Sequence, residues 1–200
     1  MRHKGIAIRL TSSRTTAILH AVAQKFRHIP QHPPSQLACT LRTVDLSATA
    51  DAETVCVLLD SYARHEIGTG AALPAAVLEA LPAALGAMPG VLVLLADVGA
   101  KPVGLAVCLP SFSTFTARPV LNIHDLMVLP DFRRRGIATH LLDAALRHAR
   151  ARGCAKITLE VREGNVAGRG LYRRFGFTGD ASTEPRRTFF LERSCDDRPA

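Results

Sequence analysis

The chain has 200 residues, 48% of them hydrophobic and 21% charged, and its formal net charge is +8. This length suits one well-filled domain, and the composition is that of a globular protein rather than a disordered one. No stretch approaches the roughly 20 uninterrupted apolar residues of a bilayer span, so we expect no membrane partner.

The positive charge is concentrated near the N-terminus. Residues 1–40 contain six Lys and Arg residues and no Asp or Glu, which leaves two of the eight net charges for the rest of the chain. Because the body lacks a basic excess, nucleic acid is not an expected partner. We interpret residues 1–38 as a basic N-terminal extension, disordered or outside the fold, that is either a transit peptide or a non-essential segment. Residues 39–200 are expected to form one domain.

After residue 39 the hydrophobic pattern alternates between the periods of strands and helices. The clearest helix has Ile137, Leu141, Ala145 and Ala149 at four-residue spacing and ends at Gly153. The interleaved order predicts an α/β (mixed α+β) fold with a mixed sheet and helices on both faces. In chain order we predict a strand at 41–46, helices at 52–64 and 72–88, strands at 91–98, 103–109 and 120–129, a helix at 136–152, a strand at 156–161, a helix at 166–175 and a strand at 188–191.

The five cysteines include no Cys-x-x-Cys pair. Their odd number and their spacing indicate neither a zinc site nor a disulfide framework, so we expect no metal. Lone cysteines are usually small core hydrophobes rather than nucleophiles. We therefore expect reduced thiols and a cytoplasmic location.

The most informative segment is a strand that runs through a turn into a helix. Pro130 ends the strand because proline cannot donate to a β ladder, and the helix begins at Gly136. A helix N-terminus presents free N–H groups and the positive end of the helix dipole, which suits a phosphate. Gly136 allows close backbone approach, Ala138 is small, and Arg133 adds positive charge. The alternative is a positively charged turn that only links a strand to a helix.

Two blocks between residues 125 and 177 resemble the GNAT superfamily of N-acetyltransferases. The loop R-R-R-G-I-A at 133–138 is similar to that family's Arg/Gln-x-x-Gly-x-Gly/Ala loop. The second block, from Asn165 through Tyr172 to Phe177, has the family's spacing, with Gly168 where Ala is usual. The resemblance implies the GNAT fold within residues 39–200. That fold has a mixed, mostly antiparallel central sheet, splayed at the acetyl-CoA site, with helices on both faces.

The resemblance also implies acetyl-CoA as cosubstrate. The backbone of Leu126, Met127 and Val128 would pair with the pantetheine arm as an added strand does. The amide of Val128 would polarise the thioester carbonyl, and Asn165 would hold the arm. The pyrophosphate would lie on the loop formed by Arg133, Arg134, Arg135, Gly136, Ile137 and Ala138.

Four residues are candidates for proton transfer. By resemblance, Tyr172 would protonate the departing CoA thiolate; otherwise it is a core tyrosine on an amphipathic helix. His124, Asp125 or Glu160 would take the proton of the attacking amine, directly or through water. Because side chains alternate along a strand, His124 and Asp125 are not expected to face the same side. Each of the three can instead be an ordinary strand residue.

The predicted function is transfer of an acetyl group to a primary amine of a small molecule. Residues 111–115 and the following strand are similar to the polyamine acetyltransferase branch. That branch has Glu-Asp where this chain has His124 and Asp125, and the lost negative charge weakens the assignment. The alternatives are a protein or peptide N-acetyltransferase and a non-catalytic CoA-binding regulatory module, against which the presence of Asn165 and Tyr172 argues. A homodimer is one assembly that the sequence allows.

Overall fold

The computed structural model describes residues 38–66 and 68–178. These residues fall into two compact units that divide between Glu160 and Val161. The predicted strand at 188–191, and all but the last residue of the predicted extension, lie outside the described residues. In the described part of the chain, no helix has the length and apolar character needed to cross a membrane.

The first unit contains one five-stranded sheet in the order β1-β2-β3-β4-β5. The first three pairings are antiparallel, and β4 pairs with β5 in parallel. The predicted mixed, mostly antiparallel sheet is therefore confirmed. The strands are β1 (Cys39–Thr43), β2 (Leu92–Val98), β3 (Lys101–Ser113), β4 (Arg118–Val128) and β5 (Lys156–Leu159).

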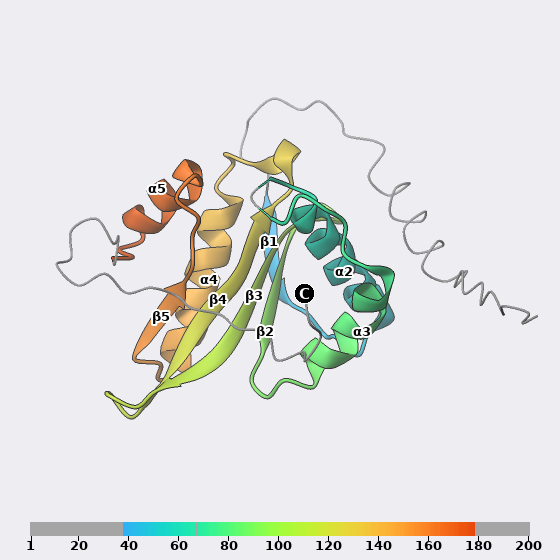
Figure 1. Cartoon of the computed structure of the whole chain (residues 1–200). Helices are drawn as coiled ribbons and strands as arrows, with labels where there is room; N and C mark the ends of the chain where they lie inside the picture. The colour runs from blue at the N-terminus through green and yellow to red at the C-terminus, as the bar shows by residue number, and fades with distance from the viewer. Residues whose placement is uncertain (1–37, 67, 179–200) are drawn as a thin grey trace, which may run out of the picture. The chain divides into compact units, whose positions relative to one another are not determined.

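Helices cover both faces of this sheet (Figure 1). Helices α2 (Thr49–Ala63) and α3 (Ala75–Gly86) pack on one face, where Leu58 and Leu85 join a core that includes Leu105 of β3. Helix α4 (Ile137–Ala151) covers the other face. There, a Cβ added at Gly104 of β3 would lie 3.2 Å from side-chain atoms of α4, so the glycine permits close packing.

The hairpin of β3 and β4 is longer than predicted. Pairing continues to Ser113 and Arg118, although the sequence suggested that the first strand ends at residue 109. The guanidinium of Arg118 donates hydrogen bonds to the carbonyls of Gly153 (2.9 and 3.1 Å) and Cys154 (3.1 Å), which follow α4. These hydrogen bonds connect the start of β4, next to the hairpin turn, to the segment that follows α4.

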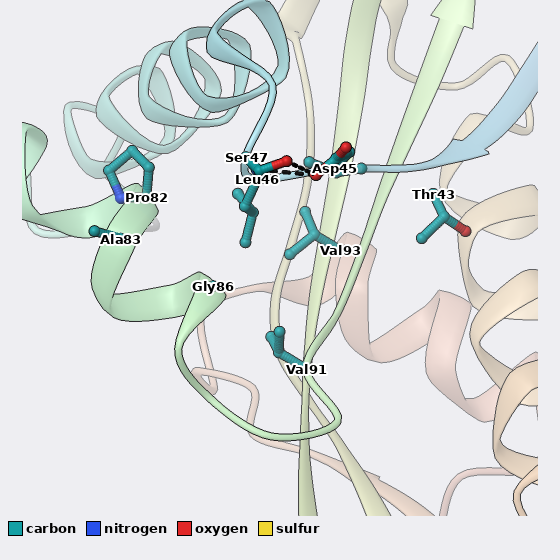
Figure 2. Close-up of a pocket in the computed structure, with 10 residues that line it drawn as sticks. Thr43, Asp45, Leu46, Ser47, Pro82, Ala83, Gly86, Val91 and Val93 are labelled. Carbon is teal, nitrogen blue, oxygen red and sulfur yellow. Dashed lines mark hydrogen bonds between the residues drawn. The ribbon is translucent and has the colours of Figure 1, made fainter.

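A pocket of about 450 Å³ lies where the end of β1, helix α3 and the start of β2 meet (Figure 2). Val91, Val93 and Leu46 supply apolar lining. At its rim, the Asp45 carboxylate accepts hydrogen bonds from the hydroxyl and the N–H of Ser47, and both bonds lower the pKa of Asp45. None of the predicted site residues is among those that line this pocket.

The second unit contains helix α5 (Val166–Arg174). Asn165 caps this helix, since its Oδ1 accepts the N–H of Gly168 at 2.9 Å. The rings of Tyr172 and Phe177 pack edge to face with centroids 5.9 Å apart. The predicted helix at 166–175 is confirmed within one residue.

Candidate active site

The end of β4 extends beyond its neighbour β5. The two strands pair only from Val120 with Lys156 to Ile123 with Leu159, whereas β4 continues to Val128. On its other side β4 remains paired with β3 up to Val128. Within the described sheet, the edge of β4 from residue 124 onward therefore faces no strand. This is the stretch predicted to pair with a pantetheine arm, and those of its amides that point away from β3 can pair with an added strand.

Strand β4 contains a bulge at His124. Val107 of β3 pairs with Asp125, and the next residue of β3, Cys108, pairs with Ile123. Two residues of β4 thus oppose one residue of β3, which interrupts the alternation of side chains. The expectation that His124 and Asp125 face opposite sides assumed strict alternation, and that assumption does not hold here. Two influences act on the pKa of the neighbouring Asp125 carboxyl: burial raises it, and electrostatic interaction with His124 opposes this shift.

Burial is the larger influence on Asp125. It raises the pKa of the carboxyl above its ordinary value, and His124 only partly opposes this shift. The strand partner of Asp125, Val107, belongs to the core under α2 and α3, so the carboxyl lies beside an apolar region. A carboxylate with a raised pKa is a stronger base than an exposed one, which suits removal of a proton from an amine.

Polar side chains also join β4 to β5. The Asn122 side-chain amide donates to Thr158 Oγ1 at 3.1 Å and to Glu160 Oε1 at 3.4 Å. Asn122 and Thr158 are register partners, so both lie on the seam just before the strands stop pairing. Sequence reasoning identified Glu160 but missed Asn122. The sequence did contain one indication of its role, because Asn122 is a polar residue between the apolar residues Leu121 and Ile123.

The loop after β4 enters α4 through residues with left-handed backbone conformation. A short 3₁₀ helix, η1 (Pro130–Phe132), is followed by Arg134 at φ +63° and Gly136 at φ +80°. Gly136 is the N-cap of α4, no described side chain caps this helix, and a Cβ at Gly136 would meet no described atom within 4 Å. The first N–H groups of α4 and this open space are consistent with a bound pyrophosphate. The predicted strand, turn and helix are confirmed.

The arginines of this loop differ in their contacts. Arg133 is directed back toward the protein: its Nε donates to the carbonyl of Val128 at 3.0 Å, and its Nη1 lies 3.1 Å from Nε2 of His65. Arg135 lies over the buried ring of Phe132 (5.5 Å), as does Nζ of Lys101 (5.3 Å). Sequence reasoning missed His65 and Lys101, because both come from segments distant in the chain.

Asn165 and Tyr172 lie in the second unit. The cap that Asn165 makes explains Gly168, which occupies a position where the resemblance leads one to expect Ala. A Cβ at residue 168 would lie 2.7–2.9 Å from the side chain of Asn165, which is too close for any residue larger than glycine without rearrangement.

Two of the described cysteines do not suit a nucleophilic role. Cys56 and Cys108 are buried, and burial raises the pKa of Cys108 to about 12. Since the thiolate is the nucleophile, a thiol with such a pKa is inert near neutrality. The prediction that these residues are core hydrophobes is confirmed for Cys56 and Cys108.

Known proteins share this fold. The chain is 39% identical over 82 residues to an uncharacterized N-acetyltransferase of Methanocaldococcus jannaschii, a match covering 40% of this chain and 36% of that protein. Across three curated relatives, the chain spans 36% to 59% of their lengths. The structure also resembles the ribosomal-protein-alanine N-acetyltransferase from Brucella melitensis biovar Abortus 2308 (TM-score 0.58, 23% identity, 76% of this chain and 100% of that chain). A further likeness is to AAC(6′)-Iy in complex with the bisubstrate analogue CoA-S-monomethyl-acetylneamine (TM-score 0.61, 19% identity, 79% of this chain and 99% of that chain).

The family model described as acetyltransferase (GNAT) matches residues 58–177. The match begins within α2 and includes the end of β4, the loop that follows it and α5, so it contains every predicted site residue. Since it covers more than half of the chain, the protein belongs to the acetyltransferase (GNAT) family.

Proposed function

We propose that this protein is an acetyl-CoA-dependent N-acetyltransferase that acetylates a primary amine of a small molecule. The observation that carries the proposal is the partly buried carboxyl of Asp125 at the bulge of β4, beside the strand edge that β5 leaves without a partner. The proposed base, Asp125, is therefore next to the strand edge at which the pantetheine arm of acetyl-CoA would bind. The described cysteines are free thiols, which suits the reducing cytoplasm, where we place the protein.

The binding roles follow the backbone. The N–H groups at the start of α4 and the loop before it take the pyrophosphate, with Arg134 and Arg135 supplying positive charge. The edge of β4 at Leu126 and Met127 takes the pantetheine amides, and the N–H of Val128 stabilises the oxyanion that forms at the thioester carbon. Asn165 uses Oδ1 as the cap of α5, which leaves its Nδ2 as a donor for the arm.

The chemical step needs one base and one acid. Asp125, with Glu160 as the alternative base, accepts the proton that the amine loses, directly or through one water. The amine nitrogen bonds to the acetyl carbon, and the carbon–sulfur bond then breaks. Tyr172 donates its hydroxyl proton to the departing CoA thiolate, so the products are the N-acetylated amine and CoA.

The solved structures with a similar fold include proteins whose names indicate different acceptors. One is a ribosomal-protein-alanine N-acetyltransferase, and another was captured with a conjugate of CoA and an acetylneamine. We favour a small amine because two carboxyl groups, those of Asp125 on β4 and of Glu160 just after β5, lie near the end of the paired region, and carboxylates attract a cationic acceptor. A peptide acceptor is the second candidate.

A thiol-release assay tests the proposal. Acetyl-CoA is supplied with polyamines, aminoglycosides, amino acids and peptides in turn, and each acceptor is matched with a control whose amines are already acetylated. Release that requires a free amine on a small molecule supports the proposal, whereas release with peptides alone favours the alternative. Tight CoA binding in calorimetry without turnover of any acceptor would favour a regulatory module.

A further inference from the structure

The connection between α2 and α3 is folded tightly against the end of α2. The carbonyl of Ala63 accepts hydrogen bonds from the N–H groups of Thr69 (3.0 Å) and Gly70 (2.9 Å). Asp60, only 6% exposed, accepts the N–H of Leu73 with Oδ1 at 2.8 Å. The other carboxylate oxygen of Asp60 accepts from Arg64, the C-cap residue of α2. The described residues of this connection are thus held by specific contacts.

This connection contacts the loop before α4 through one side chain. Nε2 of His65 lies 3.1 Å from Nη1 of Arg133, although the two residues are 68 positions apart. A guanidinium only donates hydrogen bonds, so Nε2 of His65 is the acceptor in this pair. Arg133 also donates to the carbonyl of Val128 at 3.0 Å. One guanidinium therefore joins two acceptors on two different elements.

The peptide group after Val128 is held at both of its polar atoms. Its carbonyl oxygen accepts from Arg133, and its N–H, which belongs to Leu129, donates to the carbonyl of Val103 at 2.8 Å. A peptide group fixed at both ends cannot rotate without losing a hydrogen bond, and an arginine bond to a carbonyl is among the stronger ones. The orientation of the end of β4, including the neighbouring N–H of Val128, therefore depends on Arg133.

We infer that Arg133 and His65 act together as positioning residues for the end of β4, rather than Arg133 as a ligand of the pyrophosphate. The inference rests on the proposed function, because the N–H that they orient is the one assigned to the thioester. It adds to the proposed function that His65, in the connection between α2 and α3, contributes to the cosubstrate site. Arg133 fixes the peptide, and His65 fixes Arg133.

A double-mutant cycle tests the link. We expect CoA affinity, measured by calorimetry, to fall about tenfold in Arg133→Ala and about threefold in His65→Leu, as for the loss of a charged and of a weaker hydrogen bond. Because His65 acts through Arg133, the double variant should lose about tenfold, not about thirtyfold. His65→Gln keeps an acceptor oxygen and should bind CoA within about twofold of wild type. His148→Leu, near the far end of α4, is the matched control and should bind normally.

The same cycle is repeated with Arg133→Lys, which keeps the charge but not the two-pronged geometry, so that misfolding of the alanine variant cannot conceal the result. Additive losses, or wild-type affinity in His65→Leu, would overturn the inference while leaving the proposed function intact. Failure of the wild-type protein to bind CoA would overturn both. Equal losses in His65→Gln and His65→Leu would also reject the acceptor role of His65.

Discussion

Burial of the Asp125 carboxyl has a consequence for stability as well as for chemistry. Because its folded pKa is raised, the folded state holds this proton more tightly than the unfolded state does. Stability should therefore fall as pH rises from the ordinary aspartate value of about 3.9 through the raised folded value, and stay level above it. Asp125→Asn removes the ionisation, so it should raise the Tm at neutral pH, with the gain disappearing at pH values below both pKa values.

Thermal unfolding of wild type and Asp125→Asn across this pH range measures the effect. Asp143→Asn is the control, since Asp143 is a half-exposed residue of α4 that pairs with Arg147. A gain that is equally large at low and neutral pH would show that the substitution acts through packing and not through ionisation.

The same carboxyl should control the acid side of the activity profile. A general base must be deprotonated, so kcat/KM should rise with pH through the raised pKa of Asp125. Asp125→Asn should lower turnover by about 10²–10⁴-fold and remove this rise, as for the loss of a general base. If Asp125→Asn kept both turnover and profile while Glu160→Gln lost them, the base would be Glu160.

Tyr172 separates an enzyme from a binding module. Its ring packs against Phe177, and Tyr172→Phe keeps that ring while removing the hydroxyl. We expect turnover to fall by about 10²–10⁴-fold, the typical contribution of a general acid, with near-normal acetyl-CoA affinity and Tm. Tyr62→Phe, at the other tyrosine of the chain, should stay within about threefold of wild type, which is under ~1 kcal/mol of barrier. A similarly small effect in Tyr172→Phe would exclude it as the acid.

At the scale of elements, the two ends of α4 offer a matched pair of glycines. Gly136 has φ +80° and Gly153 has φ +67°, and an added Cβ meets no described atom within 4 Å at either. Glutamate at each position should cost roughly 1–2 kcal/mol of stability, because left-handed backbone disfavours side chains. Only Gly136→Glu places a carboxylate where the pyrophosphate is proposed to lie, so it alone should lower CoA affinity, by more than about tenfold. Equal affinity in the two variants would refute the loop assignment.

The elements themselves were largely predictable from periodicity. Helix α4 was expected at 136–152 and is found at Ile137–Ala151, because its apolar face repeats at helical spacing and Gly153 ends it. Helix α3 begins at Ala75 rather than at 72, because Pro74 is extended (φ −57°, ψ 145°) and serves as the N-cap. Strand β5 was expected to end at residue 161. It ends at Leu159, because its pairing with β4 stops at that residue.

The site was predictable where it is contiguous in sequence and not where it depends on tertiary contacts. The strand, loop and helix around Gly136 form one continuous motif. The bulge at His124 instead depends on the register between β3 and β4. The contacts of Arg133 with His65 and of Asn122 with Thr158 join segments 68 and 36 positions apart. Residue type alone made Arg133 a phosphate ligand, whereas its neighbours indicate a positioning role.

At the scale of the whole molecule, the charge is divided unevenly. Six of the eight net positive charges lie before residue 41, whereas β1 begins at Cys39. Residues 39–178 include all the elements of the proposed site. We therefore propose that residues 1–38 are not needed for the acetyltransferase fold and that any affinity for nucleic acid resides in them.

Deletion of residues 1–38 tests both statements in one protein. The shortened chain should keep its Tm, and its CoA affinity should stay within about twofold of the full chain, which is under ~0.5 kcal/mol.

A short DNA duplex titrated at two salt concentrations measures the affinity for nucleic acid. Where the full chain binds, its affinity should fall steeply with salt because Lys and Arg release counterions, and the shortened chain should bind far more weakly. Loss of CoA binding on deletion would place the domain boundary before residue 39. DNA affinity that survived deletion would instead assign a nucleic-acid surface to the domain itself, against the near-neutral charge of that part of the chain.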